Sequence, residues 1–558
     1  MSLPVITDEA LAQLQTHIRD FRAGELSLDD FRRRRSAFGI YGLRGTNDRV
    51  VARIKVPSGQ LSADQMTMVG ELTAEFACDR CHVTTRQALQ LHGVSLDAAP
   101  SLLRRLRDAG LTTMESSGNR VRNIVACSRA GLCMDELFDV TPYALAVADY
   151  FHGNPFCSAL PRKFKIGFSG CRKDCAQTAT HDVGVLASAA GSRHGFRISA
   201  GGGLGRLPSE GQLLEPFTSI DQLLPTLDAI VRIFDRLGDR TSRAKARLKY
   251  LIQRIGFEAF RALVMEQRAA SRLEIGDLAL PAPIPSETRW DARWPRHENA
   301  DYDRWLTTNA KFQRQPGYAS VIVRVPTGDL SAAQCIGLAT IARSFSRGKL
   351  VTTPTQNVLL PWVELHNVAL VYEELSNLGL ASSDAEHIRD IVSCPGVGSC
   401  QIGIAATRNL VHVLDGMLGQ PAYQAGEIRA LRIRASGCHN ACARHHVADI
   451  GFHGVLSTSH GRPLPCYELL VGGGAEDGRA WFATPLARLP ARHVPDALKT
   501  LLHSFRDHRQ DGESFRTYLQ RTGTVTLQAL LTPHTTVGPP AEDPEAYTDW
   551  NSPAGEFS

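Results

Sequence analysis

The sequence predicts an α+β fold in which one structural unit is built twice. Four cysteines recur at a constant offset of 267 residues, which relates Cys127 to Cys394 and Cys175 to Cys442. The surrounding segments recur as well: IKVPSGQLSADQ at 54–65 matches VRVPTGDLSAAQ at 323–334. In both copies strand-like alternation gives way to helix-like periodicity. Self-similarity of this kind is the signature of a duplicated chain.

The first copy follows an N-terminal segment, residues 1–40, that is predicted to be a helical arm with a run of four arginines, Arg32–Arg35, at its end. This run is either a docking surface for an acidic partner or an ordinary solvated helix face. Beyond it, VVARIKV alternates as a strand does, and the same order of elements recurs from Ser320 to Leu378. The remaining predicted elements of the first copy are a helix at 62–76, a strand at 82–92 and a helix at 98–109.

Three further segments complete the chain. A helical region is predicted at 219–272, and the prolines of LALPAPIPSETRWDARWPRHENA mark a linker at 278–317. The tail at 532–558 is rich in proline and acidic residues, so we expect it to lack regular structure.

Length and composition allow a large multidomain enzyme. The chain has 558 residues, 43% of them hydrophobic, and its net charge of +5 is too mild to indicate nucleic-acid binding. The N-terminus lacks the basic start and apolar run of a signal peptide, and no apolar stretch approaches the ~18 residues needed to span a bilayer. We therefore expect the thirteen cysteines to be reduced thiols in the cytoplasm.

The cysteine pairs of the second copy suit a metal cluster. Cys394 and Cys400 lie in SCPGVGSC, and Cys438 and Cys442 lie in SGCHNAC. Two tight pairs separated by a long gap can gather four thiolates around a cubane of iron and sulfide. Zinc pairs are usually two to four residues apart, so the wider first pair fits zinc less well, and plain core cysteines are the other alternative.

Short motifs in the first copy carry a family resemblance. Together with C-x5-C and C-x3-C, the segments TTRQ, VRN and LPRKFK resemble the sirohaem-dependent sulfite and nitrite reductases over roughly Tyr41 to Glu476. The resemblance implies a sirohaem whose iron is bridged to a 4Fe-4S cluster through Cys442. It also implies two ferredoxin-like half-domains, which join into one sheet about a pseudo-twofold axis, and two sirohaem/Fe-S α/β domains. The half-domains are expected at 41–115 and 318–382, and the larger domains at 116–277 and 383–531.

The resemblance further implies a cationic site. Sirohaem carries many carboxylates and sulfite is a dianion, so both need several fixed positive charges. The residues expected to line the distal face of the sirohaem are Arg86, Arg122, Lys163 and Lys165. Further cofactor contacts are expected from Arg162, Asn123, Gln356, Asn357 and Asn440, with Gln87 as a weaker candidate. The expected metal ligands are Cys394, Cys400, Cys438, Cys442, Cys127, Cys133, Cys171 and Cys175.

The activity implied is the six-electron reduction of sulfite to sulfide, with cationic groups that hold the anion and relay protons. Reduction of nitrite to ammonia on the same scaffold is the alternative. A cobalamin-pathway monooxygenase and a non-catalytic Fe-S electron carrier are alternatives of other classes. No G-x-G-x-x-G fingerprint follows a strand, since GGGLGR ends in Arg206, so an external donor such as ferredoxin or a separate flavoprotein is expected.

The two cysteine sets are not expected to be equivalent. Most single-chain members of the family keep only the second set, so the first can hold a second cluster, with or without a second sirohaem. At the matching positions of the second copy, two cations remain, Arg389 and Arg432, and two are lost, at Ala430 and Pro354. Each lost charge-assisted contact would forgo roughly 1.5 to 3 kcal/mol of anion binding. The first centre is therefore predicted to be structural or an electron relay.

Other features have ordinary explanations. Cys78 and Cys81 form a C-x2-C pair with no partner pair, and single cysteines are expected in the core. His445 and His446 could donate to a cofactor or be structural. The glycine runs 201–203 and 472–474 permit either a tight turn or close approach of backbone to a macrocycle. The single cysteines are Cys157, Cys335 and Cys466.

Overall fold

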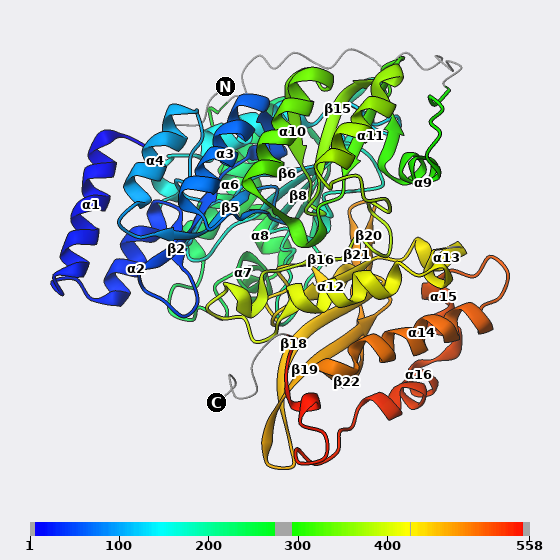
Figure 1. The fold of residues 1–558 in the computed structure, drawn as a ribbon. Helices are drawn as coiled ribbons and strands as arrows, with labels where there is room; N and C mark the ends of the chain where they lie inside the picture. The colour runs from blue at the N-terminus through cyan, green and yellow to red at the C-terminus, as the bar shows by residue number, and fades with distance from the viewer. Residues whose placement is uncertain (1–5, 274–292, 425, 551–558) are drawn as a thin grey trace.

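The computed structural model describes residues 6–273, 293–424 and 426–550. Two small half-domains lie side by side, with α3 (Ala63–Phe76) next to α10 (Ala332–Phe345) (Figure 1). Two larger α/β domains extend from them. None of the described helices is both long enough and apolar enough to cross a membrane.

The half-domains have the same order of elements. Both α3 and α10 begin with a capping box, in which Ser62 pairs with Gln65 and Ser331 with Gln334, so each helix start is set locally. The other elements of the first are β1 (Ile40–Gly42), β2 (Arg49–Ile54), β3 (Gln60–Ser62), β4 (Cys81–Val83), β5 (Leu89–Ser95) and α4 (Ala99–Asp108). Those of the second are β11 (Ala310–Phe312), β12 (Tyr318–Val323), β13 (Asp329–Leu330), β14 (Lys349–Thr352), β15 (Val358–Glu364) and α11 (Val368–Asn377).

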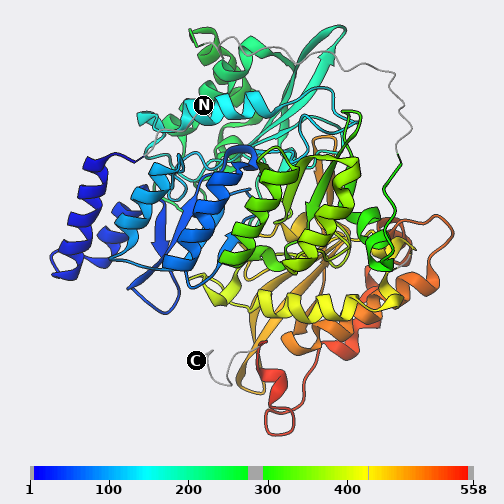
Figure 2. The same ribbon diagram turned by 45° about the horizontal axis from the view of Figure 1, so that its top comes forward.

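The two half-domain sheets exchange their edge strands. The sheet of the first runs β1-β2-β5-β4-β13 and that of the second runs β11-β12-β15-β14-β3, so each ends in a strand of the other copy. Two sheets therefore form where the sequence predicted one. The chain crosses over at two tight turns whose central residues, Ser58 and Thr327, have left-handed backbones. Figure 2 shows the two half-domains, in blue and green, side by side.

The predicted strand at 82–92 is divided in two. β4 ends at Val83, β5 begins at Leu89, and a loop at 84–88 that contains Arg86 lies between them. Gln87 in this loop has a left-handed backbone (φ 58°), which a continuous strand would not allow.

Each of the two larger domains has its own mixed sheet, and the two sheets have the same design. The orders are β10-β9-β8-β7-β6 and β16-β17-β18-β19-β22, and in each sheet two parallel pairings are followed by antiparallel ones. The bounds in the first are β6 (Val125–Ala126), α5 (Thr141–Phe151), β7 (Ile166–Ser169), β8 (Val183–Ala190), β9 (Arg193–Ala200), β10 (Gln212–Ser219), α6 (Ile220–Leu237), α7 (Leu248–Ile255) and α8 (Phe257–Ala269). Those in the second are β16 (Val392–Ser393), α12 (Thr407–Leu418), α13 (Gly426–Arg429), β17 (Ile433–Ser436), β18 (Ile450–Ser459), β19 (Arg462–Val471), β22 (Thr484–Pro490), α14 (Val494–His508), α15 (Phe515–Thr522) and α16 (Thr524–Leu531).

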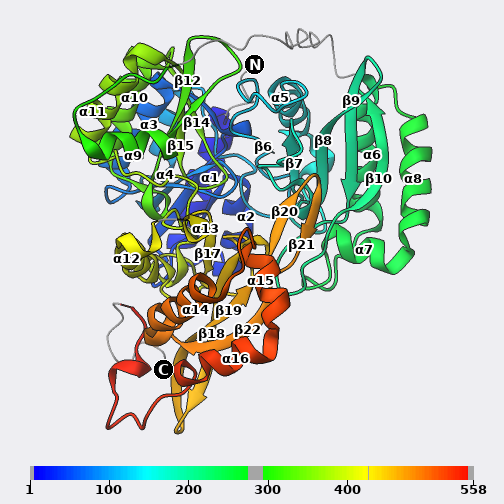
Figure 3. The same ribbon diagram turned by 90° about the vertical axis from the view of Figure 1, so that its right-hand side faces the viewer.

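A hairpin of β20 (Gly474–Glu476) and β21 (Arg479–Trp481) reaches from the second large domain to the first (Figure 3). The Arg172 guanidinium lies 3.1 Å from the Asp477 carboxylate, and Arg479 donates to Glu210. These contacts link the two repeats at a point far from the half-domains.

Part of the predicted linker is regular structure. Residues 274–292 lie outside the described part of the chain, but α9 (Ala300–Asn309) and β11 fall within 278–317. The Asn299 side chain caps α9 by accepting from the Asp301 N–H at 2.8 Å. The predicted linker thus contains a helix and a strand, and its role as a linker between the repeats stays a prediction.

The described part of the tail is anchored. Asp549 is fully buried, and its carboxylate accepts the Ala406 N–H at 2.6 Å in front of α12. The Trp550 indole donates to the Ala491 carbonyl at 3.1 Å. Between 532 and 550 the regular structure is limited to two short 3-10 turns, Thr532–His534 and Glu545–Tyr547; residues 551–558 lie outside the described part.

The N-terminal arm consists of α1 (Asp8–Arg22) and α2 (Leu28–Ala37). The arginine run in α2 is largely used within the arm. Arg32 and Arg33 form ion pairs with the aspartates three residues before them, and Arg35 is buried over the Phe31 ring. The hypothesis that the run Arg32–Arg35 docks an acidic partner stays a prediction.

Candidate functional site

The second cysteine set is gathered at one edge of a sheet. Cys394 follows β16, and Cys438 and Cys442 follow β17, which is parallel to β16. Since parallel strands end at the same edge, the loops after them meet. The Cys394 N–H donates to the Ala435 carbonyl at 3.2 Å, and Ala441 has a left-handed backbone (φ 55°) that turns the chain just before Cys442.

One backbone N–H group and one side-chain amide donate hydrogen bonds to these sulfurs. The Gly437 N–H donates to Cys394 Sγ at 3.0 Å, and the Asn440 side chain donates to Cys438 Sγ at 3.4 Å. Burial, and then the nearby Cys442 thiol, raise the pKa of Cys394 to about 12. Hydrogen bonds to sulfur are a recurrent feature of iron–sulfur sites, where they help to set the reduction potential.

The spacing of the thiols argues against a single ion. Among the described residues, no three Cys, His, Asp or Glu side chains converge closely enough to hold one metal ion. The four thiols nevertheless affect one another's pKa values, so they share one region of the structure. This arrangement fits a cubane of four irons better than zinc.

Cys442 is the exposed member of the set. It lies against the first repeat, where the Thr85 hydroxyl donates to the Cys442 carbonyl at 2.8 Å. The Arg444 guanidinium donates to the Thr85 carbonyl at 2.7 Å and fixes the loop at 84–88 in place. The loop that carries Arg86 is thereby held beside the last cysteine.

Four predicted cations of the first repeat meet next to Cys442. Lys163 and Lys165 lie close enough to Cys442 for its thiolate to raise their pKa values, and Arg86 lies beside Arg122 and Lys165. The structure thus brings together Arg86, Arg122, Lys163 and Lys165, as the motifs suggested. It also places Arg162 beside Lys163.

These cations have no matching carboxylates. Arg122 donates to the carbonyls of Ser116 and Gly118 at 3.0 and 2.7 Å, and Arg86 donates to the Asn123 carbonyl. In the described chain, none of the four predicted cations forms an ion pair. The Asp182 carboxylate in this region is occupied by Arg247, at 3.0 and 2.8 Å.

Burial therefore acts against the charges of this site. It lowers the pKa of Lys163 to about 7 and that of Arg122 to about 9, with neighbouring arginines as further causes. Burial and then Lys163 and Arg86 lower the pKa of Lys165 well below its usual value. An anionic ligand would reverse these shifts, so the site is chemically suited to a group with several carboxylates.

Asn123 positions this site from behind. Its side chain accepts the Val56 N–H at 3.0 Å and donates to the Val56 and Arg86 carbonyls, both at 2.8 Å. The amide is fully used by backbone groups. It holds the Arg86 loop on the half-domain, and its predicted contact with a cofactor stays a prediction.

Gln87 and Gln356 form a symmetric pair of staples. Gln87 donates to the Thr352 carbonyl at 2.8 Å and accepts the Ala126 N–H at 2.9 Å. Gln356 donates to the Val83 carbonyl at 3.0 Å and accepts the Ser393 N–H at 2.8 Å. Each amide ties the opposite half-domain to a strand that precedes a cysteine, which is a positioning role. Direct cofactor contact by either amide stays a prediction.

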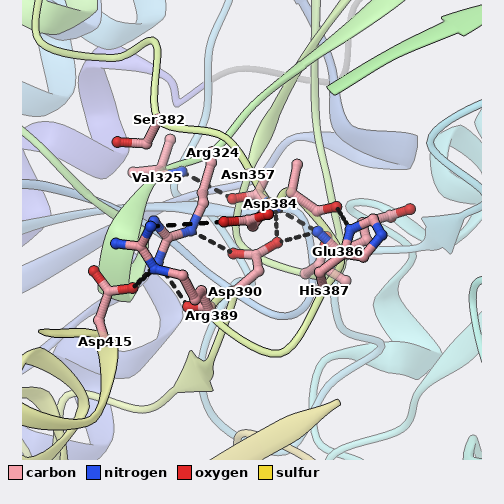
Figure 4. A network of polar contacts seen from close by, with 12 residues as sticks. Arg324, Val325, Asn357, Ser382, Asp384, Glu386, His387, Arg389, Asp390 and Asp415 are labelled. Atoms are coloured by element: carbon pink, nitrogen blue, oxygen red, sulfur yellow. Dashed lines mark hydrogen bonds and ion pairs between the residues drawn. The ribbon is translucent and has the colours of Figure 1, made fainter. Parts of the chain in front are cut away.

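Asn357 belongs to a different network (Figure 4). It accepts the Val325 N–H at 2.9 Å and donates to the Asp390 carboxylate at 2.6 Å. The structure therefore does not bring it together with Arg86 and its neighbours. It occupies a site equivalent to that of Asn123, because Val56 and Val325 are matching residues.

The histidines and glycines after the motifs have structural contacts. His446 shares a hydrogen bond with the Gly205 carbonyl at 2.9 Å, while both ring nitrogens of the buried His445 lack a protein partner in the described chain. A Cβ at Gly202 or Gly473 would lie 2.3 Å from a backbone oxygen, so these glycines allow close backbone packing within the protein. Cys81 is buried and lies beside Cys335.

Two arginines of the site were not found from the sequence. Arg444, two residues after Cys442, donates to Thr85 and to Gln177 and lies near Arg86. Arg247 precedes α7 and reaches Asp182. The position of Arg444 next to the SGCHNAC motif could have indicated it. Arg247 lies in a predicted helical region that contains no motif.

The first cysteine set is also gathered. Cys127 follows β6, and Cys171 and Cys175 follow β7. The neighbouring Cys171 thiol and then burial raise the pKa of Cys133, and the neighbouring Cys127 raises that of Cys175. All eight predicted cysteines therefore lie in two groups of four, one in each repeat.

The residue that matches Arg86 is Thr355. The Thr353 N–H donates to the Asn357 carbonyl as the Thr84 N–H does to the Ala88 carbonyl, which sets an offset of 269 in this loop. The sequence alignment that placed Pro354 opposite Arg86 is wrong by one residue, because the loops differ in spacing from the cysteines. Neither Pro354 nor Thr355 carries the positive charge of Arg86, so this cation is absent from the second repeat in both alignments.

Comparison with known proteins places the chain in a family. A model of the nitrite and sulphite reductase 4Fe-4S domain matches residues 117–273 and 384–537, and one of the nitrite/sulfite reductase ferredoxin-like half domain matches 43–109 and 311–378. The four matches alternate along the chain as the repeats do.

Relatives and a solved structure agree with this. The chain is 30% identical to ferredoxin–nitrite reductase of Zea mays, over 81% of this chain and 78% of that protein. It is 28% identical to sulfite reductase [ferredoxin] 1 of Mycolicibacterium paratuberculosis, over 85% and 83%. The structure of the Mycobacterium tuberculosis NirA protein has the same fold, with a TM-score of 0.77, 23% identity and coverage of 93% and 97%. The chain is thus an oxidoreductase with a duplicated α+β fold, and it belongs to the nitrite and sulfite reductase family.

Proposed function

We propose that the protein reduces sulfite to sulfide at a sirohaem bridged by Cys442 to a 4Fe-4S cluster on Cys394, Cys400, Cys438 and Cys442. One observation carries the proposal. Half-buried cations without carboxylate partners lie near the exposed last cysteine of the second set. Such an excess of partly desolvated positive charge is costly unless a polyanionic ligand offsets it.

When bound, sirohaem supplies an open iron position for the anion and a path for electrons from the cluster. The protein's own groups then act on the anion. Arg86, held by the Asn123 carbonyl, and Arg122, held by the Ser116 and Gly118 carbonyls, are fixed donors that need little reorganisation. Lys163 and Lys165 lie beside these arginines, and their ammonium groups would hold the anion and donate protons to its departing oxygens.

Sulfite is preferred over nitrite in this proposal. Lys165 adds a cation beside Lys163 and Arg86, and a dianion gains more from an added cation than a monoanion does. The relatives bear both names, so reduction of nitrite to ammonia is the second candidate.

Electrons come from an external donor, and ferredoxin is the donor that we propose. Several relatives are named ferredoxin-dependent, and this sequence has no dinucleotide fingerprint after a strand. No disulfide joins two cysteines of the described chain, which fits the cytoplasmic location that we propose.

The test is to replace Cys442 by serine and to record the absorption spectrum and sulfite turnover of anaerobically purified protein. We expect Cys442→Ser to lose the sirohaem bands and turnover, because the bridge is lost. Cys466→Ser, which alters a buried cysteine on β19, is the matched control and should keep both. Wild-type turnover in Cys442→Ser would contradict the proposal, and wild-type protein without sirohaem bands would favour an electron carrier.

Steady-state kinetics with sulfite and nitrite and one donor decide the substrate. A higher kcat/KM for sulfite is expected. A higher value for nitrite would replace sulfite by nitrite in the proposal and leave the rest intact.

A further inference from the structure

The first cysteine set has the loop geometry of the second. In both sets the residue before the last cysteine has a left-handed backbone, Asp174 with φ 47° and Ala441 with φ 55°. Three further hydrogen bonds match between the copies. The Cys127 N–H donates to the Phe168 carbonyl, as the Cys394 N–H does to the Ala435 carbonyl. The Cys133 N–H donates to the Arg129 carbonyl, as the Cys400 N–H does to the Gly396 carbonyl. The Ala176 N–H donates to the Ser169 hydroxyl, as the Ala443 N–H does to the Ser436 hydroxyl.

Both loops are covered in the same way by the opposite repeat. The Arg44 N–H donates to the Ser399 carbonyl at 3.1 Å, and the Arg314 N–H donates to the Leu132 carbonyl at 2.9 Å. Over the first loop, Arg314 also forms an ion pair with the buried Glu136 at 3.0 Å. The first loop is therefore built and shielded as a cluster loop is.

The thiols of the first set are buried and close together. Cys127, Cys133 and Cys171 are 4%, 6% and 3% exposed, while Cys175 is exposed as Cys442 is. As in the second set, no three side chains of the described chain converge on one ion. The first set thus offers four thiols gathered from two loops, as a cubane requires.

The surroundings of Cys175 do not offer the charge of the second site. Arg389, which matches Arg122, has its Nε 3.0 Å from the Asp415 carboxylate and its Nη1 3.6 Å from the Asp384 carboxylate (Figure 4). The fully buried Asp384 also pairs with Arg304 and Arg429. Arg122 has only carbonyl partners, whereas Arg389 already has two carboxylate partners, which it shares with other arginines.

One more difference disfavours an anionic macrocycle at Cys175. Thr355 stands where the active site has Arg86, so a donor cation is absent at this position. A sirohaem here would meet fewer cations, and the arginine that remains is already paired with carboxylates.

The two sets also differ in their hydrogen bonds to sulfur. In the second set the Gly437 N–H donates to Cys394 Sγ at 3.0 Å, and the Asn440 side chain donates to Cys438 Sγ at 3.4 Å. The counterpart of Asn440 in the first set is Lys173, whose ammonium group instead pairs with the Asp135 carboxylate at 2.5 Å. Because N–H donors stabilise the more negative, reduced cluster, fewer donors give a lower reduction potential.

We propose that Cys127, Cys133, Cys171 and Cys175 hold a second 4Fe-4S cluster, which carries no sirohaem and has a lower reduction potential than the cluster of the second repeat. The inference goes beyond the proposed function and does not depend on which anion is reduced. Catalysis is thereby confined to the second centre.

The first experiment measures iron, acid-labile sulfide, zinc and sirohaem in anaerobically purified protein. We expect about eight labile sulfides and one sirohaem per chain, as two cubanes require. Cys171→Ser should lose half of the sulfide and keep the sirohaem bands, whereas Cys438→Ser should lose half of the sulfide together with those bands. Cys157→Ser, outside both sets, is the control and should match the wild type.

Three results would overturn the proposal: about four labile sulfides per wild-type chain, stoichiometric zinc, or two sirohaems. The first two leave the proposed function intact, because the second cluster and its sirohaem remain. Wild-type protein with about eight labile sulfides but without sirohaem bands would instead count against the proposed function alone.

A redox titration of the wild type, followed by electron paramagnetic resonance, does not depend on the folding of a variant. Two reduced-cluster signals should appear, and only the signal of higher potential should show coupling to the sirohaem iron. A single cluster signal, or coupling of the signal of lower potential, would refute the proposal.

Discussion

At the scale of single residues, the site is defined by charges that are left unpaired in one repeat and paired in the other. Arg122 donates only to carbonyls, whereas its counterpart Arg389 lies between the carboxylates of Asp384 and Asp415. The protein bears a cost for the first arrangement, because buried charges without partners destabilise the fold. Such a cost is typical of a functional site.

Lys165 should set the preference between anions. Replacing it by asparagine removes a cation but leaves a donor, so we expect Lys165→Asn to lower kcat/KM for sulfite by about tenfold or more, the equivalent of a contact of 1.5 kcal/mol. The value for nitrite should fall less. The ratio of the two kcat/KM values is the measurement, and Lys499→Asn, an exposed lysine with its own partner Asp496, is the control. An unchanged ratio would contradict the role of Lys165.

Asp329 should make stability depend on pH. Burial alone would raise its pKa, but the hydrogen bond from His82 and the Arg408 charge lower it to about 2. A lowered carboxyl pKa stabilises the fold above the unfolded value of about 3.9, and this stability is lost as the pH falls toward about 2.

Asp329→Asn should therefore lower the urea midpoint at pH 7, by the equivalent of roughly 2 kcal/mol. The difference from the wild type should shrink as the pH falls below about 4. Asp303→Asn, at an exposed position, is the control. A difference that stays constant from pH 7 to pH 3 would rule out this linkage.

At the scale of elements, the two glutamine staples connect the half-domains to the cysteine strands. Gln356→Met keeps the size of the side chain but leaves the Val83 carbonyl and the Ser393 N–H without partners. We expect a loss of about 1 to 3 kcal/mol in the free energy of unfolding. Because the Ser393 N–H immediately precedes Cys394, iron should also be lost faster to a chelator.

The control for this change is Gln222→Met on the exposed face of α6, which should shift stability by less than about 0.5 kcal/mol. The comparison uses urea unfolding and the rate of bleaching of the cluster absorption. Equal behaviour of the two variants would show that the staple has no positioning role.

At the scale of the whole molecule, strand exchange makes the two repeats one folding unit. β13 completes the sheet of the first half-domain, and β3 completes that of the second, so neither repeat has all the strands of its own sheet. An edge strand without its partner exposes unpaired backbone groups and promotes aggregation.

A chain split within 274–292 tests this interdependence. Co-expressed as 1–273 and 293–558, the two pieces should copurify with iron and the sirohaem bands, because the exchanged strands hold them together. Each piece expressed alone should be largely insoluble. Recovery of 1–273 alone as a stable folded monomer would contradict the exchange.

The sequence by itself determined the duplication and the two cysteine sets, whereas the four cations were expected from the family resemblance of three motifs. The cysteine sets are encoded locally: the tight spacing of each pair brings its side chains to one loop, and the constant offset repeats them. The capping boxes at Ser62 and Ser331 likewise begin α3 and α10 without help from distant residues.

Only the tertiary structure decided which features act together. The exchange of β3 and β13, the pairing of Arg389 with Asp415, the anchoring of the tail by Asp549 and the approach of Arg247 all join segments that are far apart in the chain. No local pattern carries this information, because burial and charge pairing depend on what the rest of the fold places opposite each side chain. The same residue type, arginine, is therefore left without a carboxylate at 122 and paired with carboxylates at 389.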